Sequence, residues 1–133
     1  LADLQFTRSE ALKQGQTVTA CVSPTSTSCS TTSNWHNGWI IFSDSNGNAT
    51  VDSNETVLRV QKAFTGGDTV APDSTLNAVT FNRDGFALNL PNAGVLLTIR
   101  DPTSNKAALR CLSIGVSGVM STLKNATAPT VCK

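Results

Sequence analysis

One change of pattern near residue 15 limits what this chain can fold into: a single helical segment precedes sequence that is typical of strands. Leu1, Leu4, Ala11 and Leu12 recur at helical spacing and share one face, and Gly15 marks the end of the helix. Because a helix of about 15 residues is marginal alone in water, it must pack on the rest of the chain.

Arg8 falls inside the apolar face of this helix, an unusual place for a charged side chain. Its stem can lie along apolar surface with the guanidinium at the edge, or the guanidinium can pair with a carboxylate of the following domain. Leu1 already lies on the apolar face, so we expect the chain to begin partway along a longer helix.

The rest of the sequence predicts short strands separated by turn dipeptides. Asn37-Gly38 and Asn46-Gly47 are two such turns, and Asp84-Gly85 and Ser117-Gly118 predict tight hairpins. The predicted strands are Thr17–Val22, Trp39–Asp44, Thr56–Ala63, Ala78–Asn82, Phe86–Leu90, Val95–Arg100, Leu109–Val116 and Val119–Lys124. One helix followed by strands favours an α+β fold with antiparallel sheet over a parallel doubly wound fold.

Length and composition place the chain among single globular domains. Its 133 residues are 39% hydrophobic and 14% charged, with a formal net charge of +1. These values exclude a highly charged disordered chain, and no apolar run of about 18 residues is present to cross a membrane. Ser, Thr and Asn are abundant, which gives the polar, uncharged surface common in exported β-rich proteins.

Four cysteines in a short chain predict two disulfides. Neither Cys21 and Cys29 nor Cys111 and Cys132 have the Cys-x-x-Cys spacing of a zinc site. Of the three possible pairings, Cys21–Cys29 with Cys111–Cys132 needs the least chain rearrangement, and we expect it. Two such bonds indicate an oxidising compartment; the alternative is four buried free thiols in a cytosolic protein.

Six segments stand out by their order and spacing along the chain: Arg8–Gly15, Trp35–Asp44, Asp52–Arg59, Phe81–Gly85, Arg110–Ile114 and Ser117-Gly118. Together they resemble the GspH/FimT/FimU group of minor pilins and pseudopilins. The resemblance runs from the helix to about Gly118, and the tryptophan motif with its following Asp/Asn-rich turn is the more specific part.

The resemblance implies a pilin-like fold: a truncated N-terminal helix packed on an antiparallel β-rich head of two small sheets or a sandwich. Residues 1–15 would be the C-terminal half of the pilin helix and residues 16–133 the head. Family members carry a hydrophobic N-terminal segment that lies in the inner membrane before assembly, then packs into the filament core. Leu1, Leu4, Arg8 and Leu12 would form the assembly face of the helix, with Leu1, Leu4 and Leu12 anchoring it to the sheet.

The resemblance also implies partners and a location. The partners are other minor pilins with the major pilin or pseudopilin, and the inner membrane through the N-terminal helix. The location is the bacterial cell envelope, with a periplasmic head before assembly and a filament afterwards. The expected function is a minor pilin that takes part in assembly and priming at the tip of a type IV pilus. A type II secretion pseudopilin of the GspH kind is an alternative.

The sequence shows no arrangement typical of an enzyme and predicts no cofactor. It contains no Gly-x-Ser-x-Gly motif and no phosphate-binding glycine loop. His36 is the one histidine, in a turn between Trp35 and Trp39, and we expect it to be structural. The two tryptophans favour core packing; a glycan-binding platform on an adhesive β-sandwich is the alternative.

One loop has oxygen-bearing side chains at positions of a calcium-binding pattern. The positions are Asp44, Asn46, Asn48, Asp52 and Glu55. Ala49 replaces the glycine that this pattern requires, and its flanks are strands rather than helices. The sequence therefore favours a solvated hairpin loop, with calcium as the alternative and no other metal expected.

Basic side chains gather toward the C-terminus, which raises the alternative of a DNA-binding minor pilin for natural transformation. They are Arg100, Lys106, Arg110, Lys124 and Lys133, against one acidic residue, Asp101. Some FimT members bind DNA through a Gly-Arg-x-Arg motif, which Gly118-Val119-Met120-Ser121 replaces here. Lacking both arginines, the chain is closer to a FimU-like priming role.

Overall fold

The computed structural model describes residues 2–72, 75–88, 90–91, 94–103 and 109–124. Within these residues, helix α1 (Ala2–Gln14) is followed by a short 3-10 helix and nine strands. The elements after α1 are β1 (Val18–Val22), η1 (Trp35–Asn37), β2 (Gly38–Ser43), β3 (Val57–Lys62), β4 (Thr69–Pro72), β5 (Ala78–Phe81), β6 (Ala87–Leu88), β7 (Val95–Arg100), β8 (Arg110–Ile114) and β9 (Met120–Lys124).

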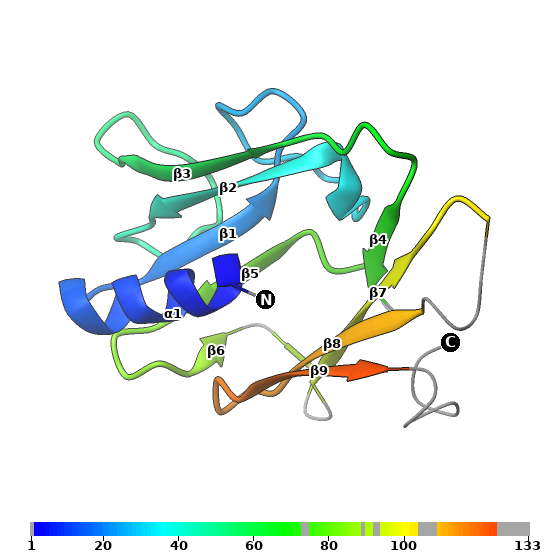
Figure 1. Ribbon diagram of the computed structural model, residues 1–133. Coiled ribbons are helices and arrows are strands. Elements are labelled where there is room, and N and C mark those ends of the chain that lie inside the picture. The colour runs from blue at the N-terminus through cyan, green and yellow to red at the C-terminus, as the bar shows by residue number, and fades with distance from the viewer. Residues whose placement is uncertain (1, 73–74, 89, 92–93, 104–108, 125–133) are drawn as a thin grey trace.

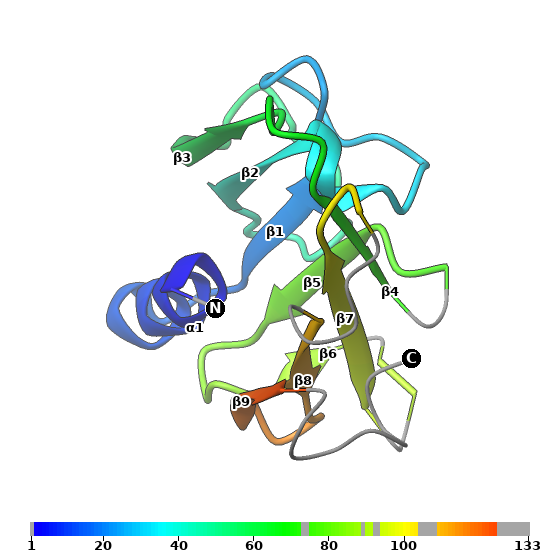
Figure 2. The same cartoon turned by 45° about the vertical axis from the view of Figure 1, so that its right-hand side comes forward.

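The strands form two antiparallel sheets, which confirms the expected fold class. The first sheet has five strands in the order β3-β2-β1-β5-β6, and the second has four in the order β4-β7-β8-β9. Figure 1 shows α1 lying across the first sheet, with the second sheet beyond the start of the helix. The turned view in Figure 2 separates the two sheets and shows α1 on one side of the first.

The helix packs on the first sheet through a narrow face. Leu4, Thr7 and Ala11 are buried, and the polar Thr7 is accommodated because its hydroxyl donates to the carbonyl of Asp3 at 2.7 Å. Gly15, with φ +66°, ends the helix, as predicted. The prediction that Leu12 anchors the helix to the sheet is wrong, because Leu12 is 46% exposed. Leu1 lies outside the described residues.

The main core fills the space between the helix and the two sheets. Alternate residues of β1 point into it, since Val18, Ala20 and Val22 share the face that meets Leu4 and Ala11. From the second sheet it receives Val70, Leu97, Leu112 and Ile114. One layer of apolar side chains thus connects the helix with both sheets.

The opposite face of the first sheet carries a second apolar cluster, which contains a disulfide. Cys21, Ile40 and Phe42 are buried there. Cys21 bonds to Cys29 with an S–S distance of 2.08 Å, so the first predicted disulfide is confirmed. The bond holds the Ser/Thr-rich loop on the face of the sheet that does not contact the helix.

The outer face of the second sheet carries the other cysteine of the described residues. Cys111 is buried beside Leu109, Leu96 and Leu123, and it is disulfide-bonded. Cys132, its partner in the predicted pairing, lies outside the described residues.

All eight predicted strands are present, with small changes at their ends. Both predicted hairpins are present too, one joining β5 to β6 and the other joining β8 to β9. Strand β4 is missing from the predictions. This strand is short, ends in Pro72 and follows two glycines, so its sequence gives little sign of a strand. It lies at the edge of its sheet, where a proline can be accommodated without the loss of a hydrogen bond between strands.

Removing the disulfide of the first sheet should destabilise the fold without abolishing it. We expect Cys21→Ser/Cys29→Ser to lower the free energy of unfolding by about 2.5 kcal/mol, because the unfolded chain regains the entropy of an open loop. Urea unfolding followed by circular dichroism measures the change. Ser28→Ala, on an exposed residue of the same loop, is the control. Equal urea midpoints for the double variant and the native chain would contradict this expectation.

Candidate functional site

Polar contacts at the N-terminal half of α1 fix its angle to the first sheet. The carboxylate of Asp3 accepts a hydrogen bond from Trp39 Nε1 at 2.8 Å and one from Arg59 Nη1 at 3.0 Å. The guanidinium of Arg59 also lies 3.8 Å from the centroid of the Phe6 ring. Two strands, β2 and β3, therefore hold the same turn of the helix.

A cavity of about 230 Å³ lies where this turn faces the second sheet. Its lining is almost entirely apolar, with Asp3 at one side. The lining residues are Asp3, Leu4, Trp35, Trp39, Phe64, Val70, Leu97, Ile99 and Leu112. An apolar lining of this kind offers no acid–base pair for catalysis.

The two tryptophans belong to the wall of this cavity. Trp35 is only 3% exposed and its Nε1 donates to the carbonyl of Leu76 at 3.0 Å. Its ring centroid lies 6.3 Å from that of Trp39, which in turn packs edge-on against Phe64. Core packing is thus confirmed for Trp35, and the pair does not form an open glycan platform.

His36 connects η1 to the edge of the second sheet. The backbone N–H of Val70 in β4 donates to His36 Nδ1 at 3.2 Å, and the N–H of Phe64 donates to the carbonyl of His36 at 3.0 Å. The imidazole thereby accepts from a backbone N–H on the outer edge of β4, which has no further strand beside it among the described residues to bind this group. The prediction of a structural histidine is confirmed.

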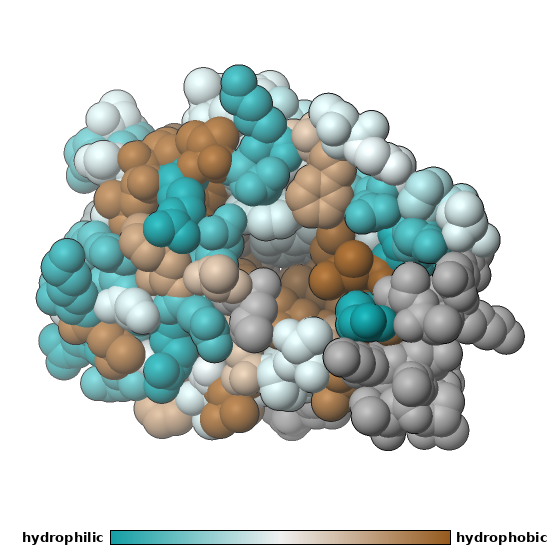
Figure 3. All heavy atoms as spheres, in the orientation of Figure 1, coloured by the Kyte–Doolittle hydropathy of each residue, from teal (hydrophilic) through white to brown (hydrophobic). Residues whose placement is uncertain are grey.

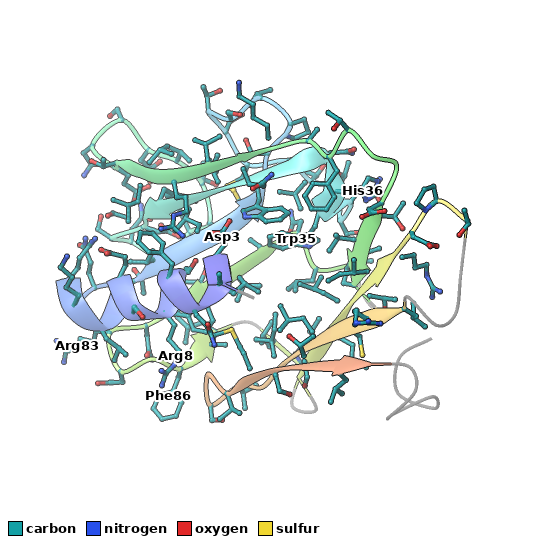
Figure 4. The ribbon with its side chains drawn as sticks, viewed as in Figure 1. Asp3, Arg8, Trp35, His36, Arg83 and Phe86 are labelled. Carbon is teal, nitrogen blue, oxygen red and sulfur yellow. A yellow bond between two sulfur atoms is a disulfide. The ribbon has the colours of Figure 1, made fainter. Side chains whose placement is uncertain are left out.

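Arg8 joins the helix to the turns of both hairpins. Its Nε donates to the carbonyl of Gly85 at 3.0 Å, so the partner of the guanidinium is a backbone carbonyl and not the carboxylate of the second alternative. The turns have room for the side chain only because residues 85 and 118 are glycines: a Cβ on Gly85 would lie 2.9 Å from Arg8 Nη2, and one on Gly118 2.5 Å from Arg8 Nε. Figure 4 shows Arg8 below the helix, beside Phe86.

The loop with the calcium-like pattern is hydrogen-bonded internally. Asp44 is buried, and its carboxylate accepts from the hydroxyl of Thr19 at 2.7 Å and from the backbone N–H of Ala49 at 2.9 Å. The carboxylate of Asp52 accepts from the side-chain amides of Asn46 and Asn48. The described residues contain no group of three or more acidic, His or Cys side chains placed to hold a metal.

The remaining member of that pattern is also engaged in the loop. Glu55 accepts from the backbone N–H of Asp52 at 3.0 Å. Ala49 adopts φ +57°, the left-handed conformation that glycine adopts more easily. The geometry therefore favours the hairpin-loop interpretation over a calcium site.

Three of the basic residues lie at one end of the second sheet. Arg100 ends β7, Arg110 begins β8, and Lys124 is the residue of β9 that pairs with Arg110. Arg110 Nη1 donates to the carbonyl of Leu109 at 3.1 Å. Lys106 and Lys133 lie outside the described residues. Three of the five basic residues thus stand at neighbouring strand ends.

Comparison with known proteins agrees with this architecture. The family model described as "Type II transport protein GspH" matches residues 1–118. The chain belongs to the GspH family. Members of this family are minor pilins and pseudopilins, which are structural rather than catalytic proteins. No curated protein sequence matches the GspH-family chain.

Solved structures share the fold of the GspH-family chain. The type IV minor pilin FimU of Pseudomonas aeruginosa, crystallised in space group P21, superposes with a TM-score of 0.74 at 22% identity, covering 99% of this chain and 88% of that one. The same protein in space group P65 gives a TM-score of 0.70 at 23% identity, covering 99% and 93%. Among the residues that the structure describes, neither helix has the length and hydropathy of a membrane-spanning helix.

Two features of the site were not predicted from the sequence. The sequence identifies Gly85 and Gly118 as turn residues, but their role in making room for Arg8 depends on two hairpins from different sheets lying next to each other. The Asp3–Trp39–Arg59 network joins residues far apart in sequence, and no local pattern signals it.

Substitutions at the Arg8 contact should loosen the helix. Arg8→Gln is expected to lower the free energy of unfolding by about 1.5–3 kcal/mol, the usual contribution of a hydrogen bond to a charged group.

Gly118→Ala should lower the free energy of unfolding more than Gly15→Ala does. Both glycines have positive φ, but only a Cβ at position 118 would meet other atoms, at 2.1 Å from the carbonyl oxygen of Gly85. Chemical denaturation measures each; equal losses for the two alanine variants would refute the close approach.

Asp44 should matter for stability and not for calcium. Both carboxylate oxygens of Asp44 accept from a backbone N–H, Oδ1 from Asn48 and Oδ2 from Ala49. Asp44→Asn replaces one of these acceptors with an NH2 group that faces a donor, so we expect a loss of about 2 kcal/mol. The exposed Asp84→Asn is the control and should change little. Calcium or chelator should leave the melting temperature of the native chain unchanged, and a shift on adding calcium would reverse the interpretation of this loop.

Proposed function

We propose that the chain is the non-enzymatic head of a minor pilin that takes part in assembly and priming of a type IV pilus at the filament tip. In this proposal residues 1–15 act as the C-terminal part of the assembly helix and residues 16–133 as the head. The fold shared with FimU, described as a type IV minor pilin, supports it.

The observation that carries the proposal is the way α1 is held. One face is buried through Leu4, Thr7 and Ala11, and polar contacts from Asp3 and Arg8 fix two separate turns. The other face, which includes Leu12, stays exposed. A helix held rigidly with one free face is suited to packing against other subunits.

The proposal implies partners and a location. The partners are other minor pilins and the major pilin, and the location is the cell envelope, with the head in the periplasm before assembly and in the filament afterwards. Leu1, Arg8 and Leu12 are proposed for the assembly face of the helix, whereas Leu4 is buried and holds the helix on the head. The apolar cavity and the engaged His36 support a non-catalytic role.

Two alternatives each have an observation in their favour. The description of the matching family model, "Type II transport protein GspH", favours a pseudopilin of a type II secretion system. The basic strand ends at Arg100, Arg110 and Lys124 favour a DNA-binding role in natural transformation. The absence of arginines at residues 119–121 counts against the second alternative.

Deletion of the gene in the bacterium that encodes it, with complementation by the natural full-length protein, separates these functions. We expect loss of most surface pili, measured in sheared fractions, with protein secretion unchanged. DNA uptake should fall only in proportion to piliation. Normal piliation with lost secretion would establish the pseudopilin alternative, and normal piliation with lost DNA uptake the DNA-binding one.

A further inference from the structure

The two hairpin turns that meet Arg8 leave three large apolar side chains in solvent. Phe86 is 50% exposed, Val116 39% and Val119 69%. They come from different sheets, and the turns are held together because the N–H of Ala87 donates to the carbonyl of Val116 at 3.0 Å. Figure 3 shows apolar surface at the lower edge of the molecule, beneath the polar surface of the helix. Singly exposed apolar residues are common, whereas neighbouring ones that form an apolar patch are typical of interaction sites.

A groove of about 510 Å³ runs beside this cluster, between the outer face of α1 and the β8–β9 turn. We call it the Arg8 groove. Its lining residues are Gln5, Arg8, Ser9, Gly118, Val119 and Met120. Arg8 holds the two walls of the groove together, since it extends from α1 and lies close against Gly118 of the β8–β9 turn.

The guanidinium of Arg8 gives the groove a positive charge without a local counterion. Its Nε is bonded to Gly85, but Nη1 and Nη2 have no hydrogen-bond partner among the described residues, and Arg8 forms no ion pair there. Asp84, beside Gly85 in the same turn, does not pair with it. A planar guanidinium with free Nη atoms is suited to bidentate binding of a carboxylate.

We propose that the Arg8 groove docks a different pilin-fold subunit, one that presents a carboxylate next to an apolar side chain. The carboxylate binds Arg8, and the apolar side chain packs on Val119 and Phe86. The proposal rests on the function proposed above, because it requires that the chain assembles with other subunits.

A second copy of this chain is a poorer occupant. A two-fold contact through this groove would bring two Arg8 guanidiniums toward each other, which is repulsive. A nucleic acid is also a poorer occupant, because one guanidinium makes a single phosphate contact while the exposed aliphatic side chains of Val116 and Val119 have no partner on a phosphate backbone. An acidic, partly apolar protein surface satisfies both features of the groove.

Site-specific photo-crosslinking in the filaments tests the proposal. A photo-reactive residue replaces Val119 in the natural full-length protein, and crosslinked products are identified by mass spectrometry in sheared filaments. The matched control is Val60, which is 45% exposed on edge strand β3 of the first sheet. We expect crosslinks to another pilin subunit from position 119, at least tenfold more than from position 60.

A charge substitution tests the role of Arg8 without removing its contact with Gly85. For this test the photo-reactive residue replaces Phe86. Val119→Asp should then reduce crosslinking about tenfold, because the new carboxylate binds the guanidinium of Arg8 and repels the carboxylate of the partner subunit. Val60→Asp should leave it unchanged, and thermal melting of both variants verifies folding.

The outcomes separate this proposal from the one on which it rests. Equal crosslinking from positions 119 and 60, or crosslinks mainly to copies of this chain or to nucleic acid, would overturn the docking proposal while the chain remains a filament subunit. Absence of the protein from every filament fraction would overturn both.

Discussion

The side chain of Arg8 joins parts of the molecule that the backbone leaves separate. The buried face of α1, formed by Leu4, Thr7 and Ala11, is narrow, and apolar packing through it would not by itself prevent the helix from rotating or sliding. Arg8 prevents this by reaching the β5–β6 turn of the first sheet and the β8–β9 turn of the second. Two glycines are required for that approach, so one guanidinium fixes the geometry of three elements.

The same arrangement connects the fold to the proposed function. Since the buried face of α1 is committed to the core and Asp3 fixes its first turns, the exposed face is presented at a constant angle. A subunit that assembles with others depends more on a fixed orientation of its contact surface than on a reactive pocket. The Arg8 groove depends on the same contact, since the hydrogen bond from Arg8 Nε to Gly85 holds the helix while Nη1 and Nη2 have no partner among the described residues.

The sequence was sufficient for the fold class because its turn dipeptides and alternating strands agree with each other locally. It failed where the interaction was not local. The apolar pattern predicts Leu12 on the buried face because it leaves out Thr7, a polar residue that is buried with its hydroxyl bonded to the carbonyl of Asp3. Strand β4 was missed because an edge strand ending in Pro72 carries little alternation. The acceptor for Arg8 is a backbone carbonyl. Every residue has such a group, so residue types alone do not predict this contact.

The cysteines that form disulfides lie outside the main core that joins the helix to the two sheets. Cys21–Cys29 lies on the face of the first sheet away from the helix, and Cys111 lies on the outer face of the second. Neither touches the layer where helix and sheets meet. The contact between the helix and the two sheets therefore does not depend on either cysteine, and the Cys21–Cys29 bond adds a covalent restraint on a surface loop that lies away from that contact.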